Sequence, residues 1–377
     1  MNFALSEEQE MLQQSAKDFV ARESDLKRIR TLREDEIGFS KDLWKKMAEL
    51  GWLGIPFPEE YGGLGQGMVD MIVVMEEMGR GLMPEPIYAT VLLAGHALAL
   101  AGNEAQKKEW LPKIIEGDAF MTLGHMERDS RYDPFSVKTS AKKSGEKWVL
   151  DGEKAFVPDA HVAERIIVTA RSSGGSQSRE GVEMFLVDPK AKGVTLTNIP
   201  SMDWRKRHLV KLEKVEVSEA DRLTGATAAD ALEDVLDRAT VGLSAEMLGA
   251  MNEAFHMTLE YMKTRVQFGV PIGSFQALKH RAADEFVQTE LSRSAVYFAA
   301  MSIDEKMADA QIAVSTCKAR CNDAFHLIAN ESIQMHGGIG MTDEHDIGFF
   351  FKRARAAEVT LGDSTYHRDR YARLKEY

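Results

Sequence analysis

Two short segments near the end of the sequence combine glycines with side chains that can exchange protons. They read "QMHGGIGMT" at residues 334–342 and "AEVTLGDSTY" at residues 357–366. The carboxylate of Asp363, in the second segment, is of a type that can act as a general base. However, "GDST" also precedes a predicted final helix, in which Asp363 or Ser364 would serve as the N-cap. We favour the capping role for Asp363 and retain proton abstraction as the alternative.

Cys317 and Cys321, the two cysteines of the chain, are another pair that could do chemistry. They are spaced by four residues in "AVSTCKARCND", on a predicted helix, and could hold a metal ion. No histidine or acidic cluster stands beside them in the sequence. We therefore expect small core residues in a reducing compartment, and we expect no metal site.

The composition argues against two classes of partner. The chain has 377 residues, of which 44% are hydrophobic, so it can form two or three units with packed interiors. Asp plus Glu outnumber Lys plus Arg by 59 to 47, which argues against a sequence-independent nucleic-acid binder, because phosphate contacts need a basic face. The polar, acidic start "MNFALSEEQEMLQQSAKDF" and the lack of a long apolar run argue against a membrane segment. We expect a cytoplasmic protein.

Residue patterns divide the chain into three parts. Residues 1–119 are predicted to be helical: Ser6 is a candidate N-cap, and "SKDLWKKMAELGWLGI" repeats apolar residues at helical spacing before it stops at Gly51. Residues 120–227 carry short β-type runs separated by turn residues, with "SSGGSQSREG" predicted as a hairpin loop. Residues 228–377 return to long helices whose apolar stripes are typical of a bundle.

Three motifs lie at the joints of this arrangement. They are "PEEYGGLG" at 58–65, "RVQFGVPIGSFQALKHRAAD" at 265–284 and "QMHGGIGMT" at 334–342. The second resembles the Arg-x-x-Phe-Gly-x-x-[IL]-x-x-Phe-Gln turn of the acyl-CoA dehydrogenase family, and the third resembles its Gln-x-x-Gly-Gly-x-Gly segment. With the α, β, α order, the chain resembles that family over its whole length. The resemblance implies an α+β fold with an N-terminal all-α domain, a middle antiparallel β domain and a C-terminal four-helix bundle.

The resemblance also implies an FAD cofactor held between two subunits of a tetramer. The pyrophosphate of this cofactor needs a cation, which Arg265 would supply through a bidentate contact. Gly337 and Gly338 would let phosphate oxygens approach backbone N–H groups. The other cofactor-binding residues that the resemblance assigns are Gln267, Phe268, Gln276 and Gln334. The structural alternative is that Arg265 caps its helix and the glycines only turn the chain.

Both positions at which the family usually carries its catalytic base hold an apolar residue. In the family a carboxylate removes the acyl α-proton while the β-hydrogen leaves as hydride to flavin N5. The usual glutamate, counted from Gly337, falls on Leu361. A second family solution, counted back from Arg265, falls on Ala239. The resemblance therefore implies a chain that does not supply the base itself.

Other side chains are candidates for the missing base or for a contact with the substrate. Besides Asp363, Glu246 is a weaker candidate base, because it lies two helical turns from Ala239, a separation of about 10 Å. His336 could face a ligand, although we favour a positional or capping role. Arg238 could meet the substrate, although we favour a surface salt link.

Two segments of the middle part depart from the family's flavin-contacting pattern. The family's Thr-Glu-Pro-x-x-Gly-Ser-Asp segment reads "MERDSRYD" at 126–133, so that Met126 stands in place of the threonine. The family's Trp-[IL]-[ST] segment reads "FVP", and Pro158 offers neither a hydroxyl nor an N–H group. We therefore expect this chain's own flavin pocket to lack hydrogen-bonding groups that the family has. The residues that would contact the flavin of a neighbouring subunit match the family's pattern.

Within the family, the sequence closely resembles the small subunits of pimeloyl-CoA dehydrogenases and is similar to glutamate-lacking subunits of bacterial α2β2 dehydrogenases that act on steroid side chains. This similarity implies a subunit of an FAD-dependent enzyme that desaturates a bulky or dicarboxylic acyl-CoA with a catalytic partner subunit. It also implies electron-transfer flavoprotein as the electron acceptor. Three alternatives stay open: a homotetramer with an unusual base, a non-catalytic scaffold subunit that completes a partner's FAD site, and a base-free lyase on the same fold.

Overall fold

The computed structural model describes residues 4–377, and its elements fall into two compact units. The first, which we call the helical unit, contains the described residues up to Thr31, Gly67–Met83 and Thr240–Tyr377. The second, which we call the sheet unit, contains Leu32–Gln66 and Pro84–Ala239. Each unit is thus assembled from segments that are far apart in the sequence.

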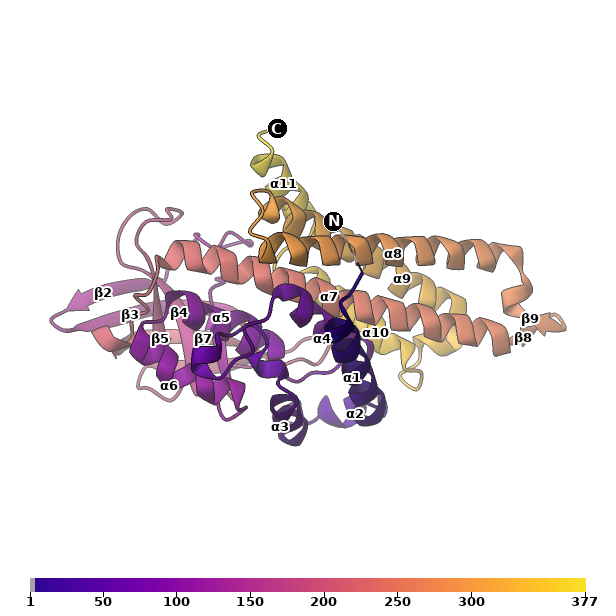
Figure 1. Cartoon of the computed structure of the whole chain (residues 1–377), viewed down its shortest axis with the longest axis horizontal. Helices are drawn as coiled ribbons and strands as arrows, with labels where there is room; N and C mark the ends of the chain where they lie inside the picture. The colour runs from indigo at the N-terminus through magenta and orange to yellow at the C-terminus, as the bar shows by residue number, and fades with distance from the viewer. Residues whose placement is uncertain (1–3) are drawn as a thin grey trace. The chain divides into compact units, whose positions relative to one another are not determined.

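Three long helices dominate the C-terminal part of the chain: α7 (Ala228–Thr264), α8 (Gln276–Asp304) and α9 (Ala310–His336). α8 and α9 lie side by side (Figure 1). A short hairpin of β8 (Val266–Gln267) and β9 (Val270–Pro271) connects α7 to α8, and a 3-10 turn, η6 (Gly337–Met341), follows α9. The shorter helices are α1 (Glu7–Glu23), α2 (Lys27–Leu32), α4 (Met68–Arg80), α10 (Ile347–Glu358) and α11 (Ser364–Leu374).

Glycines let α4 and α7 pack with their backbones in contact inside the helical unit. A Cβ atom added to Gly79 would lie 2.0 Å from the carbonyl oxygen of Glu246. One added to Gly249 would lie 1.7 Å from the carbonyl oxygen of Glu76. Neither distance leaves room for a methyl group in a close-packed interior. The two helices can therefore approach this closely only because both positions are glycine.

The helix ends follow the signals in the sequence. The Ser6 hydroxyl accepts a hydrogen bond from the Gln9 N–H, and the Gln9 side chain accepts one from the Ser6 N–H, which forms a capping box at the start of α1. α3 (Lys41–Glu49) ends just before Gly51, whose φ of +80° is a left-handed conformation that favours glycine.

The sheet unit is built on a seven-stranded sheet with the order β1-β4-β2-β3-β7-β6, in which β5 also pairs with β4. The strands are β1 (Met121–Gly124), β2 (Ser140–Ser144), β3 (Lys147–Pro158), β4 (Arg165–Arg171), β5 (Val182–Val187), β6 (Val194–Ile199) and β7 (Arg207–Ser218). Helices α3, α5 (His96–Ala101) and α6 (Glu104–Ile115), and a π-helix at Tyr88–Gly95, belong to the same unit. β4 and β5 are antiparallel, as expected for the strands that flank the predicted hairpin loop.

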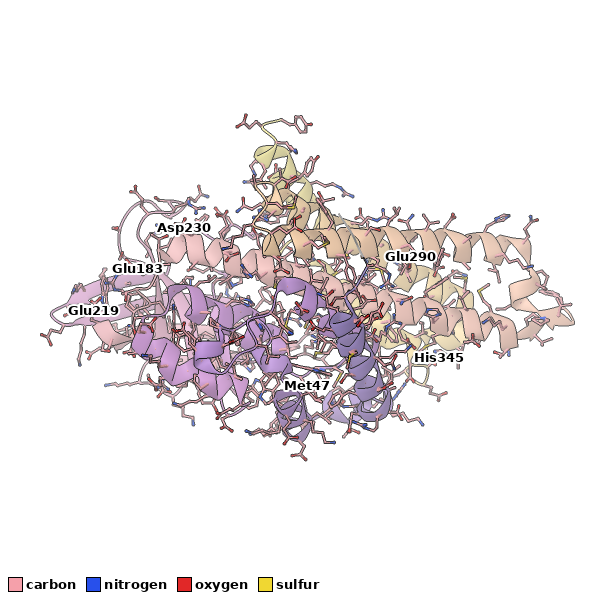
Figure 2. The ribbon with its side chains drawn as sticks, viewed as in Figure 1. Met47, Glu183, Glu219, Asp230, Glu290 and His345 are labelled. Carbon is pink, nitrogen blue, oxygen red and sulfur yellow. The ribbon has the colours of Figure 1, made fainter. Side chains whose placement is uncertain are left out.

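One apolar core holds the sheet unit together. Trp148, Phe185, Val210 and Leu212 are among its buried side chains, and the rings of Trp148 and Phe185 lie 5.5 Å apart. Charged side chains pair nearer the surface: Arg222 pairs with Glu183 and Glu219, and Arg179 pairs with Asp230, whose carboxylates are labelled in Figure 2. An exception on the strands is Lys154 of β3, which is completely buried and pairs with Glu127 at 2.7 Å.

The α+β class predicted from the sequence is confirmed. The sheet is largely antiparallel, but β1 and β2 each pair with β4 in parallel. These parallel pairings join strands that are distant in the sequence, and no local residue pattern specifies them.

Candidate cofactor and active site

The segment that begins at Arg265 forms a tight hairpin in the helical unit. Gln267 pairs with Val270, and the two residues between them, Phe268 and Gly269, have φ angles of +54° and +81°. A phenylalanine is strained in this left-handed region. Even so, the Phe268 side chain is 91% exposed. A strained backbone that holds an aromatic ring in solvent is typical of a contact surface for a ligand or a partner.

Arg265 presents a free cation at the base of this hairpin. Its backbone N–H donates to the Tyr261 carbonyl at 2.8 Å, and its carbonyl accepts from the Ile272 N–H at 2.8 Å. The side chain is exposed, and its guanidinium has no hydrogen-bond or ion-pair partner between residues 4 and 377. Arg265 is therefore positioned by its backbone, and its guanidinium remains available for an external anion.

Gly337 and Gly338 form an open turn after α9. Gly337 has a φ of +65°, and a Cβ atom added to either glycine would meet nothing within 4 Å. Gln334, one turn earlier, is exposed. An exposed backbone without side chains fits the close approach of a phosphate group.

Ring contacts connect the helix before the Arg265 hairpin with the glycine turn. The ring of Tyr261, one helical turn before Arg265, lies 4.5 Å from that of His336, which in turn lies 4.5 Å from that of His345. His336 donates from Nδ1 to the Ser332 carbonyl at 2.7 Å, and burial lowers the pKa of His336. His336 thus has a positional role and anchors the glycine turn against α7.

Leu361 occupies a strained turn between α10 and α11. It is half-buried and has a φ of +58°, while Gly362 has a φ of +114°. A Cβ atom added to Gly362 would lie 2.5 Å from a ring carbon of Tyr366, so the next position must be glycine. The turn holds residue 361 in a defined conformation, but a leucine has no group that can accept a proton.

The two candidate carboxylates both have structural partners. Asp363 is the N-cap of α11, where its Oδ1 accepts from the Tyr366 N–H at 2.8 Å. Glu246 is buried and accepts from the Nε and Nη2 atoms of Arg353, at 2.9 and 3.1 Å. The weaker candidate is therefore not a free carboxylate but half of a buried bidentate ion pair.

The remaining predicted positions lie on α7 in the sheet unit. Ala239 is completely buried. Arg238 donates from Nε to both carboxylate oxygens of Asp234, each at 3.1 Å. The predicted salt link of Arg238 is therefore present, and a contact of Arg238 with the substrate stays a prediction.

Residues 126–133 of the sheet unit stand where the family's pattern has its flavin-contacting segment. The Met126 carbonyl accepts from the Ala155 N–H at 2.8 Å, which ties the segment to β3. Arg131 and Tyr132 follow with φ angles of +44° and +76°. Pro158 ends β3 beside Arg207 and cannot donate a hydrogen bond. Met126 and Pro158 therefore offer fewer hydrogen-bonding groups to a flavin ring than the residues of the family's pattern do.

Phe156 and Lys318 were not predicted as functional residues. Phe156 is 49% exposed with a φ of +54°, so β3 holds an aromatic ring in solvent two residues before Pro158. The sequence did contain a signal for Phe156, because it is the aromatic first residue of "FVP", where the family's segment begins with tryptophan. Lys318 is completely buried on α9, and nothing in a helical sequence distinguishes a buried lysine from a solvated one.

Two negative findings apply to the described part of the chain. Between residues 4 and 377, no helix is both long and apolar enough to cross a membrane. In the same range, no group of three His, Cys, Asp or Glu side chains could hold a metal ion. Cys317 and Cys321 are buried free thiols.

Three family models match the sequence in order: "Acyl-CoA dehydrogenase, N-terminal domain" at residues 6–118, "middle domain" at 122–213 and "C-terminal domain" at 229–374. Probable acyl-CoA dehydrogenase YngJ of Bacillus subtilis is 31% identical over 98% of both chains. The ChsE4-ChsE5 complex from Mycobacterium tuberculosis is similar in structure, with a TM-score of 0.91 and 28% identity over 100% of this chain and 99% of that one. A variant of the Tcur3481-Tcur3483 steroid ACAD gives a TM-score of 0.89 and 29% identity over 98% of both chains.

Proposed function

The chain belongs to the acyl-CoA dehydrogenase family, and from this premise we propose that it is the base-lacking subunit of a heteromeric FAD-dependent enzyme. Family members are FAD-dependent oxidoreductases that act on CH–CH bonds. One observation carries the proposal: neither Leu361 nor Ala239 can accept a proton, and the nearby Glu246 is held by Arg353. Such a chain would need a partner subunit that carries the carboxylate.

The exposed groups of the helical unit fit the phosphate side of the cofactor. The Arg265 guanidinium would bind the pyrophosphate through two N–H groups, and the backbone N–H groups of Gly337 and Gly338 would approach its oxygens. The Phe268 ring would cover a flat part of the ligand. When bound, FAD supplies the acceptor for the hydride that leaves the acyl β-carbon. Because Pro158 weakens the ring side of this chain's own pocket, we assign these groups to a neighbouring subunit's FAD.

The names of the structural relatives support the partner and the substrate class. ChsE4-ChsE5 is a complex of two chains, and Tcur3481-Tcur3483 is named as a steroid enzyme. By analogy, we propose a paired assembly of the α2β2 type in the cytoplasm that acts on a bulky acyl-CoA thioester, with a dicarboxylic acyl-CoA as the alternative. We further propose electron-transfer flavoprotein as its electron acceptor.

One observation favours a homotetramer as the second candidate. The exposed ring of Phe156, held by a left-handed backbone, could cover a flavin in this chain's own pocket. In that case the chain would bind FAD and turn over substrate without a partner. A homotetramer would still need an unusual base.

Co-expression separates these possibilities. The chain is purified alone and together with a family member that carries a glutamate after its own Gly-Gly segment, such as the product of an adjacent gene. Flavin absorbance and acceptor reduction are then measured across a panel of acyl-CoA thioesters. We expect an isolated chain with little flavin and no turnover, and an active yellow complex. Robust turnover by the isolated chain would reject the proposal in favour of the homotetramer.

A further inference from the structure

Arg30 of α2 contacts the loop between the glycine turn and α10. Its guanidinium donates from Nη1 to the Asp346 carboxylate at 2.5 Å. From Nη2 it donates to the backbone carbonyls of Asp343 and Glu344, at 2.8 and 3.0 Å. The same group lies over the Phe349 ring, 4.5 Å from the ring centre. One planar cation from a distant part of the sequence therefore holds both the backbone and a side chain of this loop.

Asp346 gives up a local role for this contact. It occupies the N-cap position of α10, where an aspartate usually accepts from the first N–H groups of the helix, but its side chain makes no such bond. The carboxylate pairs with Arg30 instead, and the two side chains are only 30% and 27% exposed. Departures from a local rule of this kind concentrate at functional or strained sites. We call residues 343–346 the clamped loop.

The clamped loop carries His345, whose surroundings lead to the glycine turn. Arg30 contacts the residues on both sides of His345. The Nδ1 atom of His345 accepts from the Ile347 N–H at 3.2 Å, which orients the ring. This ring lies 4.5 Å from that of His336, the residue directly before Gly337. A path of direct contacts therefore runs from Arg30 through the two histidines to the glycine turn.

The glycine turn depends on contacts at its ends, because its centre has no side chains. A Cβ atom added to Gly337 or Gly338 would meet nothing within 4 Å. Glycine also loses more conformational freedom on folding than any other residue. His336 fixes the start of the turn, and the clamped loop follows its end. A turn that is ordered before a ligand arrives loses less freedom when the ligand binds.

We propose that Arg30 is a positioning residue for the glycine turn and raises the affinity of this turn for a phosphate group. The inference rests on the proposed function, in which Gly337 and Gly338 approach the pyrophosphate of FAD. Arg30 acts through the clamped loop and does not bind the cofactor, because its N–H groups are directed to the loop. Its effect is to hold the turn in the conformation that phosphate needs.

Hydrogen exchange on the isolated chain tests the clamp without any cofactor. The backbone amides of Thr342, Ile347 and Phe349 donate to acceptors between residues 339 and 346. In Arg30→Met, we expect their protection to fall about tenfold, the size of one charge-assisted hydrogen bond at a partly exposed site. Protection within α1 should stay the same. Unchanged protection of the three amides, or an equal loss in α1, would overturn the proposal.

Matched variants identify the contact that matters. Arg22→Met, which removes an exposed arginine paired only with the adjacent Glu23 among its ion pairs, should leave the three amides unchanged. Asp346→Asn should lower their protection less than Arg30→Met, and the double variant should match Arg30→Met, because both changes remove one contact. Additive losses would contradict this. Arg30→Lys should be intermediate, because an ammonium cannot reach all three acceptors, and it replaces Arg30→Met if that variant does not fold.

The FAD affinity of the assembled complex tests the link to the glycine turn. The flavin-free complex is titrated with FAD, and flavin fluorescence is followed. Arg30→Met should weaken binding severalfold, because the apparent Kd rises as the fraction of ordered turns falls. Excess FAD should restore wild-type turnover. A lower affinity in Arg265→Ala with an unchanged affinity in Arg30→Met would overturn this inference alone, whereas unchanged affinity in both variants would reject the proposed function with it.

Discussion

Arg265 and Glu285 are both ionisable residues of the helical unit without a side-chain partner in the described chain, but their surroundings are opposite. Arg265 is exposed, so water solvates its charge until an anion displaces it. Glu285 on α8 is only 1% exposed, and neither carboxylate oxygen has a hydrogen-bond partner between residues 4 and 377. Arg265 is therefore a functional candidate, whereas Glu285 should affect mainly stability.

Arg265→Ala should lower the FAD content of the assembled complex without unfolding it. Loss of a charge-assisted bond to pyrophosphate costs about 1.5 to 3 kcal/mol, or roughly tenfold to a hundredfold in affinity. Arg265→Lys should restore binding only partly, because an ammonium cannot make the two-pronged contact. The measurement is flavin absorbance per assembly after gel filtration. Lys263→Ala, at an exposed position two residues away, is the control; equal flavin content in the Arg265 and control variants would make Arg265 a structural residue.

Glu285→Gln should make the chain more stable at pH 8 than the wild type. Burial, followed by the charge of Glu331, raises the pKa of Glu285 to about 8 from 4.5. Between these values the folded state holds a proton that the unfolded state has lost, so wild-type stability falls as the pH rises, by at most about 5 kcal/mol.

Urea unfolding at pH 5 and pH 8 measures this effect. The two proteins should be similar in stability at pH 5 and diverge at pH 8. The exposed Glu290, also on α8 (Figure 2), provides the matched control Glu290→Gln. A wild type and Glu285→Gln variant with the same pH dependence would show that Glu285 does not titrate in this range.

At the level of elements, the sequence predicts local structure better than contacts. The Ser6 and Asp363 caps follow from residue type and position, because a cap involves only neighbouring residues. The contact of α4 with α7 depends on Gly79 and Gly249. In a helical residue pattern these two glycines stand out only by their low helix propensity. Likewise, the sequence shows that position 361 is a leucine, but not that its carbonyl accepts from His367 or that the next carbonyl, of Gly362, accepts from Lys318. Burial and long-range pairing decide these features, and neither is encoded in a local window.

Gly249→Ala should destabilise the helical unit. The new methyl group would lie 1.7 Å from the Glu76 carbonyl oxygen, so α4 and α7 would have to separate. Such overpacking costs about 1 to 3 kcal/mol or more in the free energy of unfolding, although alanine is the better helix former. Gly175→Ala is the control, because a Cβ atom there meets nothing within 4 Å. A Gly249→Ala chain as stable as its control in urea would mean that the helices adjust without strain.

For the whole molecule, the question is which subunit holds the flavin. We expect this chain's own pocket to bind FAD weakly, because Met126 and Pro158 stand where the family has hydrogen-bonding groups. Pro158→Thr restores a hydroxyl and an N–H group, and each hydrogen bond contributes about 0.5 to 1.5 kcal/mol. Flavin occupancy of the isolated chain should therefore rise, while Pro200→Thr, at an exposed position, should leave it unchanged. A wild-type chain already saturated with FAD would contradict this expectation.

The central claim is that this chain supplies no catalytic base, and α-proton exchange tests it most directly. The purified chain is incubated with an acyl-CoA thioester in D2O without an electron acceptor, and deuterium at the acyl α-carbon is followed by mass spectrometry. Because a positioned general base contributes about 100-fold to 10,000-fold, the co-expressed complex should exchange this proton, whereas the isolated chain should exchange it no faster than buffer. Exchange by the isolated chain at the rate of the complex would contradict the account, and its loss in Asp363→Asn would then identify the base.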